Sequence, residues 1–393
     1  MENKTLDLYM KEIRTEISHL DKKSIIEMII KYYDGVSITK LKNEYNISIV
    51  NSQFFTIFPE KIMPDKCEYC GYYMVQEWKS KSSYNLYTTK PYCKKCGHEN
   101  LANCECNTCE MIRSEELIRQ RERKSNLIKK VYEKDKFTSI SENDLTLEDK
   151  LYLSVLIRAA LDENIGKLKP LSSINEKLTP TGSFTKELIK TLTGRRLIVP
   201  DSTSSVDAFV DNEDFPYSYY INDVLYWLNI TSADNNYRNM IQRLMYPSQE
   251  EFEKDKEFCF TMWRKVALNE CIEYLLYSLD KVGFEFSPGE KTNKVFENLL
   301  DYFSVSQIYS IIYRAVANST KFYQEKAISK QRAANSVITS CESFGERAIA
   351  EGWRLSKYRR DYNLPETLIS KVFFTSILKI AFMGFDEVPT ENL

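Results

Sequence analysis

Histidine and glycine are both scarce in this chain, and their scarcity excludes several common kinds of active site. Only two histidines, His19 and His98, occur among 393 residues. A Ser-His-Asp or Cys-His site therefore has almost no histidine to use, and His98 is lost to it if that residue binds a metal. Glycine numbers 11, and no stretch matches the loops that cradle phosphates or dinucleotides. No familiar catalytic constellation can be assembled from the sequence.

The chain also lacks a long apolar run, a secretory signal and a large net charge. The apolar stretch at 372–385 is interrupted by Lys379 and is too short to span a bilayer. Residues 1–16 mix acids and bases, unlike a signal peptide. The net charge is −2, so any nucleic-acid contact must come from local basic patches. We expect a cytoplasmic protein with no membrane partner.

Cysteine, by contrast, is clustered, with seven of the ten residues between Cys67 and Cys109. Without a secretion signal, this clustering indicates metal binding rather than disulfides. Two Cys-x2-Cys pairs provide the four thiolates of a tetrahedral zinc site, and Gly71 and Gly97 follow them where a left-handed residue closes each turn. The predicted ligands are Cys67, Cys70, Cys93 and Cys96. The arrangement resembles a zinc ribbon.

The three remaining cysteines of the cluster need a fourth ligand, and His98 lies six residues before the first of them. The ligands predicted for a second zinc ion are His98, Cys104, Cys106 and Cys109. One alternative is an interleaved pair of sites that exchange ligands, and another leaves His98 as an ordinary polar residue. Both sites have a full set of ligands and no position for water, so we expect two structural zinc ions rather than a catalytic one.

The stretch between the two cysteine pairs resembles the hairpin finger of a ribbon, with several lysines and aromatic residues and no acid. Lysines can meet phosphates and aromatic rings can stack on bases. The predicted nucleic-acid contacts here are Trp78, Lys79, Lys81, Tyr84, Tyr87 and Lys90. The alternative is a solvated hairpin whose aromatic residues pack on the ribbon.

Apolar periodicity predicts a mainly α, multidomain chain with a small zinc-ribbon-like β module and a winged helix, followed by a C-terminal helical domain. We divide it into an N-terminal helical region, the zinc module, a basic connector helix, a winged-helix-like region and the C-terminal domain, at 1–60, 61–112, 113–140, 141–212 and 213–393. The first region has three helical pieces between residues 24 and 58 and resembles a helix-turn-helix. Its last piece, 49–58, has no charge, so a packing bundle that supports the zinc module is the alternative.

The winged-helix-like region has predicted helices at 151–161, 171–178 and 184–192, followed by strand-like runs at 195–200 and 206–210. Between Lys167 and Arg196 there are seven Lys/Arg residues against two acids. We expect the third helix to bury its leucines and isoleucine and to present its lysines to nucleic acid. The predicted contacts are Lys186, Lys190, Arg195 and Arg196.

The C-terminal region reads as helices at 222–228, 258–279, 294–316, 322–350 and 366–382. Residues 353–360 are its densest basic run, suited to a phosphate or to a charged helix end. A weaker signal is a group of acids that could serve a carboxylate-metal nuclease, namely Asp207, Asp211, Glu213 and Asp214.

These modules together predict a zinc-containing nucleic-acid-binding protein of bacterial or phage type, with DNA the favoured partner, acting in regulation or in defence against phage. The first alternative is an assembly or adaptor subunit that binds protein partners through the zinc module and the C-terminal helices. A metal-dependent nuclease is the second.

Overall fold

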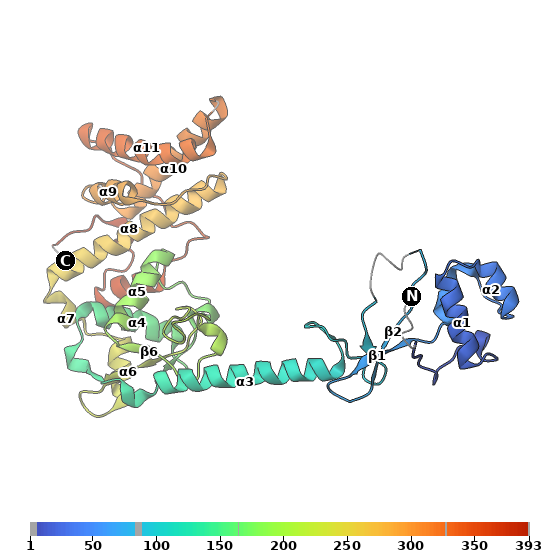
Figure 1. Cartoon of the computed structure of the whole chain (residues 1–393). Coiled ribbons are helices and arrows are strands. Elements are labelled where there is room, and N and C mark those ends of the chain that lie inside the picture. Colours follow the sequence, from blue (N-terminus) through green and yellow to red (C-terminus); the bar gives the residue numbers. More distant parts are fainter. Residues whose placement is uncertain (1–5, 83–88, 164, 327, 392–393) are drawn as a thin grey trace. The chain divides into compact units, whose positions relative to one another are not determined.

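The computed structural model describes residues 6–82, 89–163, 165–326 and 328–391. It divides the chain into two compact units, Met1–Arg123 and Lys124–Leu393. Helices dominate the described residues and the sheets are small, so the prediction of a mainly α chain is confirmed (Figure 1). None of the helices in the described part is both long and apolar enough to cross a membrane.

The first unit begins with short helices around an aromatic core. Tyr32, Phe54 and Phe58 meet there with ring centroids 5.3 to 5.7 Å apart. Asp21 and Ser37 accept backbone hydrogen bonds as N-caps of the two α-helices, which stops each helix from beginning earlier. The predicted helical pieces are confirmed, the last as a 3-10 helix. The elements are η1 (Thr15–Ile17), α1 (Lys22–Tyr33), α2 (Ile38–Glu44) and η2 (Asn51–Ile57).

A three-stranded antiparallel sheet follows, in the order β1-β2-β3. Its strands are β1 (Lys61–Lys66), β2 (Tyr73–Gln76) and β3 (Tyr92–Cys93). Among the described residues, the buried cluster beside the sheet consists of Cys67, Met74 and Cys93, with a few partly buried neighbours. Apolar packing alone therefore supplies this module with little stability.

Helix α3 (Asn107–Val131) begins among the cysteines and contains the boundary between the two units. Its middle is exposed, with Leu117 at 67% and Ile118 at 58%. Near its C-terminal end Ile128 enters the core of the second unit. The apolar residues of this helix are therefore exposed in its middle and buried near its C-terminal end.

The second unit contains a three-stranded antiparallel sheet in which β7 (Tyr226–Leu228) lies between β5 (Lys167–Leu168) and β6 (Ile198–Pro200). Helices α4 (Leu147–Ala160) and α5 (Gly182–Gly194) accompany it. Four shorter elements complete this part, with β4 and β8 paired in parallel. They are η3 (Lys134–Lys136), β4 (Ile140–Ser141), η4 (Glu142–Asp144) and β8 (Ile230–Thr231).

Three sequence predictions in this part are wrong. The helix expected at 171–178 is only η5 (Leu171–Ser173), because the carbonyls of Lys177 and Leu178 accept hydrogen bonds from residues 368 and 369 instead of from a helix. The strand expected at 206–210 is η6 (Val206–Ala208). The helix expected at 222–228 is β7, since three apolar residues fit a buried strand as well as a helix.

The rest of the second unit is helical, and the long helix α8 runs through it (Figure 1). Two predicted helices, 294–316 and 322–350, are wrong because each spans a break. Ser304 forms a capping box with Gln307, and Ser329 caps the next helix, so new helices begin there. The elements are α6 (Tyr237–Met245), α7 (Gln249–Glu253), α8 (Lys256–Lys281), α9 (Glu290–Leu299), α10 (Val305–Glu325), α11 (Lys330–Ala350), α12 (Leu368–Ser370), η7 (Lys371–Ile377) and α13 (Met383–Asp386).

Candidate metal centres and basic surfaces

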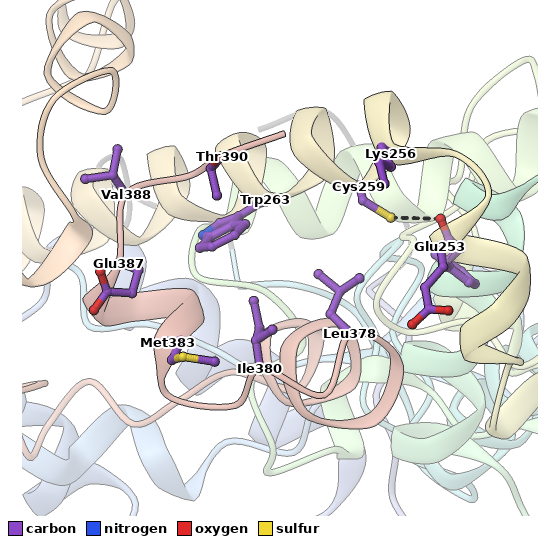
Figure 2. A pocket seen from close by; sticks show the side chains of 11 residues that line it. Glu253, Lys256, Cys259, Trp263, Leu378, Ile380, Met383, Glu387, Val388 and Thr390 are labelled. Atoms are coloured by element: carbon purple, nitrogen blue, oxygen red, sulfur yellow. Dashed lines mark hydrogen bonds between the residues drawn. The ribbon is translucent and has the colours of Figure 1, made fainter. Parts of the chain in front are cut away.

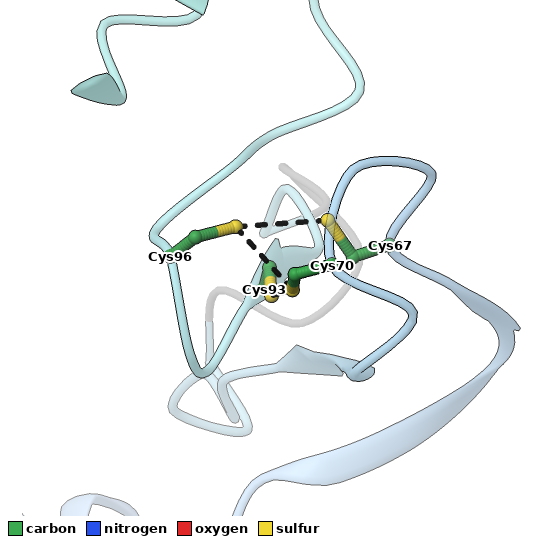
Figure 3. Close-up of side chains that lie close together, drawn as sticks. All are labelled: Cys67, Cys70, Cys93 and Cys96. Atoms are coloured by element: carbon green, nitrogen blue, oxygen red, sulfur yellow. Dashed lines mark hydrogen bonds between the residues drawn. The ribbon is translucent and has the colours of Figure 1, made fainter. Parts of the chain in front are cut away.

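The four cysteines of the two Cys-x2-Cys pairs point their sulfurs toward one another (Figure 3). The Sγ atoms of Cys67 and Cys96 are 3.6 Å apart, those of Cys70 and Cys93 3.4 Å, and those of Cys70 and Cys96 3.7 Å. A tetrahedral metal with bonds of about 2.3 Å to sulfur would space its ligands by about 3.8 Å, whereas a disulfide needs about 2.05 Å. The spacing therefore fits a metal site, and we call this group site 1.

Each Cys-x2-Cys pair lies in its own tight turn, and the two turns have the same geometry. The N–H of Gly71 donates to the carbonyl of Cys67 at 2.9 Å, and the N–H of Gly97 donates to that of Cys93 at 2.8 Å. Both glycines have positive φ, +66° and +71°, which a side chain would strain. The prediction that a left-handed residue closes each turn is confirmed.

The second group, site 2, consists of His98, Cys104, Cys106 and Cys109, whose ligand atoms lie within 4.8 Å of one another. Nδ1 of His98 is 3.2 Å from Sγ of Cys109 and 3.8 Å from Sγ of Cys106, close to the roughly 3.5 Å between two ligands of one tetrahedral metal. The ligands are thus grouped in sequence order rather than interleaved. Cys109 lies in the first turn of α3.

Electrostatics within each group favour a bound cation. Backbone N–H groups of Glu99 and Cys106 lower the pKa of Cys104 to about 6. Burial raises the pKa of Cys109 to about 11 and that of Cys96 to about 12. Burial also raises the pKa of Cys93, but N–H groups of Cys96 and Lys95 outweigh it and lower the value to about 7. Each group therefore mixes easily ionised thiols with thiols that need a cation to ionise.

Two residues that the sequence did not single out lie against site 2. Glu68 and Tyr69 belong to the first cysteine pair, yet the Glu68 carboxylate is 3.3 Å from Nε2 of His98. The Tyr69 ring meets the His98 ring edge-on, with centroids 4.6 Å apart. Their position inside a Cys-x2-Cys pair was the available signal, but nothing in the sequence showed which site they face.

The finger residues are placed mainly against the N-terminal helices. The Trp78 indole donates to the carbonyl of Pro59 at 2.7 Å, and its ring packs on Tyr33 and Phe58. Nζ of Lys81 donates to the carbonyl of Val36 at 3.1 Å. Trp78 thus packs on the N-terminal helical region, whereas the alternative expected the finger's aromatic residues to pack on the ribbon.

The other finger residues are less informative. The Lys79 carbonyl accepts a hydrogen bond from the Tyr33 hydroxyl, while Lys90 is exposed. The predicted contacts Tyr84 and Tyr87 lie outside the described residues.

Helix α5 presents its lysines as the sequence predicted. Lys186 and Lys190 are exposed and have no ion-pair partner within the described part of the chain. The opposite face is fully buried, through Leu188, Ile189 and Leu192.

The two arginines after α5 differ from each other. Arg195 forms an ion pair with the buried carboxylate of Asp149 and hydrogen-bonds Thr146, so it closes the N-terminal end of α4. Arg196 is exposed, with a left-handed φ of +57°.

The acids proposed for a nuclease are not gathered into a metal site. Among the described residues, sites 1 and 2 are the groups of three or more potential ligands close enough to share an ion. Asp211 instead forms an ion pair with Lys124 at 2.7 Å.

The basic run at 353–360 is divided between the surface and the interior. Arg360 reaches inward to Glu270, whose side chain is fully buried, at 2.8 Å. Lys357 pairs with Glu387 at 3.0 Å, and Arg354 and Arg359 remain exposed.

A cavity of about 700 Å³ lies in the second unit, where the start of α8 faces residues 378–390 (Figure 2). Its walls are largely apolar. The Trp263 indole donates to the carbonyl of Gly384 at 2.9 Å, and the Cys259 thiol donates to that of Phe252 at 3.2 Å. None of the described lining residues keeps a buried polar atom without a partner, and the charged residues that line the cavity are Glu253, Lys256 and Glu387.

Comparison with protein-family models, curated proteins and solved structures finds no match. Inference about function therefore depends on the metal groups and on the exposed cationic face of α5.

Proposed function

We propose that this chain is a zinc-containing nucleic-acid-binding protein that contacts duplex DNA through helix α5. The single observation that carries the proposal is the exposed pair Lys186 and Lys190. Other lysines of this region have acidic partners: Lys167 pairs with Asp201, and Lys177 pairs with Glu273. The α5 lysines have none among the described residues, and unpaired lysines on one helix face are suited to phosphates.

The elements around α5 support a winged helix. Their order is helix α4, strand β5, the single turn η5, helix α5 and then strands β6 and β7, with β7 central in the sheet. In helix-turn-helix proteins of this kind, the helix in the position of α5 enters the major groove. The short η5 and the long connection between β6 and β7 depart from a compact example.

The metals are best explained as two structural zinc ions. Thiolate and imidazole ligands in closed sets of four favour zinc over the harder cations. Site 1 lies at the end of the three-stranded sheet, which supports a zinc-ribbon-like module for residues 61–96. In this proposal the zinc ions hold the module together and take no part in catalysis.

The decisive experiment measures duplex binding by the full chain across a salt series. The variant Lys186→Glu/Lys190→Glu should lose most duplex affinity, and the slope of log affinity against log salt should fall by about two, one for each lost phosphate contact. The fold should persist, because neither side chain has an ion-pair partner among the described residues.

The matched control is Lys326→Glu/Lys330→Glu, which changes the net charge equally on exposed lysines near the α10–α11 connection. It should keep most of the duplex affinity. Equal losses of duplex affinity in both variants would show that the effect depends only on net charge. Full duplex affinity in the α5 variant would contradict the proposal.

The competing function, an assembly subunit, is favoured by one observation: α3 exposes Met111, Leu117 and Ile118. Such apolar side chains on a helix are suited to a protein partner. The same titrations separate the two functions, since an assembly subunit would show no salt-dependent duplex binding.

A further inference from the structure

Site 2 receives part of its support from the loop that carries site 1. Glu68 and Tyr69 are the two residues between the ligands Cys67 and Cys70, so a metal at site 1 fixes the backbone on both sides of them. Their side chains nevertheless contact ligands of site 2. One four-residue turn thus holds ligands of the first metal and partners of the second.

The contact between Glu68 and His98 determines how the imidazole can bind. Nδ1 of His98 faces the sulfurs of site 2, so a metal there leaves the ring proton on Nε2. His98 is only 2% exposed, and Nε2 is a buried atom without an aligned hydrogen bond. The Glu68 carboxylate, 3.3 Å away, is the acceptor that a small rotation would bring into line. A carboxylate in this position orients a metal-binding histidine and strengthens it as a ligand.

Tyr69 acts on the same site from the other side of the turn. Its ring packs edge-on against His98, with the two ring centroids 4.6 Å apart, so it fixes the plane in which the imidazole can turn.

The second cysteine pair also connects the two sites. The N–H of Cys93 donates to the carbonyl of His98 at 2.7 Å, and His98 follows Cys96 by two residues. Ordering either pair of site 1 ligands therefore orders backbone that site 2 uses.

We propose that the two metal sites bind cooperatively, with Glu68 and Tyr69 as the positioning residues that transmit the coupling. A metal at site 1 fixes the Cys67–Cys70 turn and so places the Glu68 carboxylate and the Tyr69 ring against His98. Because coupling between two binding equilibria is reciprocal, loading site 2 must favour site 1 by the same factor. This inference does not depend on nucleic-acid binding.

The test is a metal titration of the full chain with Cd²⁺, read by ¹¹³Cd NMR, in which sites with four and with three sulfur ligands give separate signals. Competition with a chelator supplies the affinity of each site. Glu68→Gln keeps the shape of the side chain but removes its charge, and should weaken site 2 by about 10- to 100-fold. Tyr69→Ala, which removes the ring beside His98, should weaken it less, and both variants should keep two metals at saturation.

Cooperativity is measured with one site disabled at a time. Cys96→Ser should lower the affinity of site 2, and Cys106→Ser should lower that of site 1 by the same factor. In the Glu68→Ala/Tyr69→Ala background this factor should fall markedly, because both connecting side chains are removed and only the backbone hydrogen bond between Cys93 and His98 still joins the sites.

Lys95→Gln is the matched control, since Lys95 is an exposed residue at the corresponding place in the other Cys-x2-Cys pair. It should change neither site. Unchanged site 2 affinity in both positioning variants, or independent loading of the two sites, would overturn the proposal, as would failure of the chain to bind metal. Equal weakening by Lys95→Gln would show that the effect is not specific to Glu68 and Tyr69.

Discussion

The metal-binding module and the second unit are stabilised in opposite ways. In the described part of the module, the buried cluster contains three residues, and two of them, Cys67 and Cys93, belong to site 1. The second unit has one continuous apolar core, with fully buried rings such as Tyr152, Phe184 and Phe373. A module with so little apolar surface to bury would gain most of its folding energy from metals bound at its two ligand groups, whereas the second unit has its own apolar core.

The N-terminal helices of the first unit are stabilised in a third way, by an aromatic core that a residue of the metal module completes. Their aromatic core is closed by Trp78, which comes from the chain just after β2 of the metal module. This contact joins a region stabilised by packing to one stabilised by ligation. It also explains why an aromatic residue in the finger need not be a base-stacking surface.

The largest effect should come from removing a ligand of site 1. Cys93→Ser should abolish the order of the module, because structural zinc contributes about 10 to 16 kcal/mol at pH 7 in small zinc domains. Hydrogen exchange followed by mass spectrometry would locate the change within residues 61–109. Backbone amides of the second unit should remain protected from exchange. Loss of their protection would show that the second unit also depends on the metal module.

Creating a new cavity in the core of the second unit by mutation should give the next largest effect. Phe374→Ala removes a ring that is 1% exposed and contacts Trp263, which should lower the free energy of unfolding by about 3 to 5 kcal/mol. The loss in the free energy of unfolding of this unit, measured by urea unfolding, should be the same with and without a chelator. Phe382→Ala, at a ring that is 74% exposed, is the control and should change little.

Trp78→Ala tests the contact between the two parts of the first unit. It removes a half-buried ring and the hydrogen bond to Pro59, and should cost about 2 kcal/mol in the stability of the N-terminal helices. The metal content should stay at two per chain. Weaker binding of single-stranded nucleic acid with unaltered stability would instead restore the predicted stacking role.

The smallest effect concerns pH in the second unit. Hydrogen bonds from Arg243 lower the pKa of Glu142, so this carboxylate stabilises the fold above its unfolded pKa of about 4.3 and loses that contribution as the pH falls through its lower folded pKa. Glu142→Gln should therefore cost about 1 kcal/mol at pH 7, and the difference should shrink below pH 4. Thermal unfolding of the variant and of the unchanged chain, at pH 7 and at a pH below 4, measures this difference in stability. Glu325→Gln, in an exposed pair, should show no such pH dependence.

The sequence alone was sufficient for features that depend on neighbouring residues. The two ligand groups, the left-handed glycines after each Cys-x2-Cys pair and the two faces of α5 were all predicted, because turn geometry and helical periodicity act over a few residues. Helix breaks near Ser304 and Ser329 were missed even though their caps are also local, since apolar residues on both sides concealed them.

Only the tertiary structure decided which residues meet from distant parts of the chain. Arg195 and Arg196 are adjacent and identical, yet a buried partner 46 positions earlier, Asp149, engages the first and leaves the second exposed. Arg360 was likewise drawn from a basic run into an ion pair with Glu270. Residue types and spacing determine local turns, helix faces and ligand sets, because those interactions close over short loops. Partners far apart in sequence are selected by packing the whole core, and no local pattern encodes that choice.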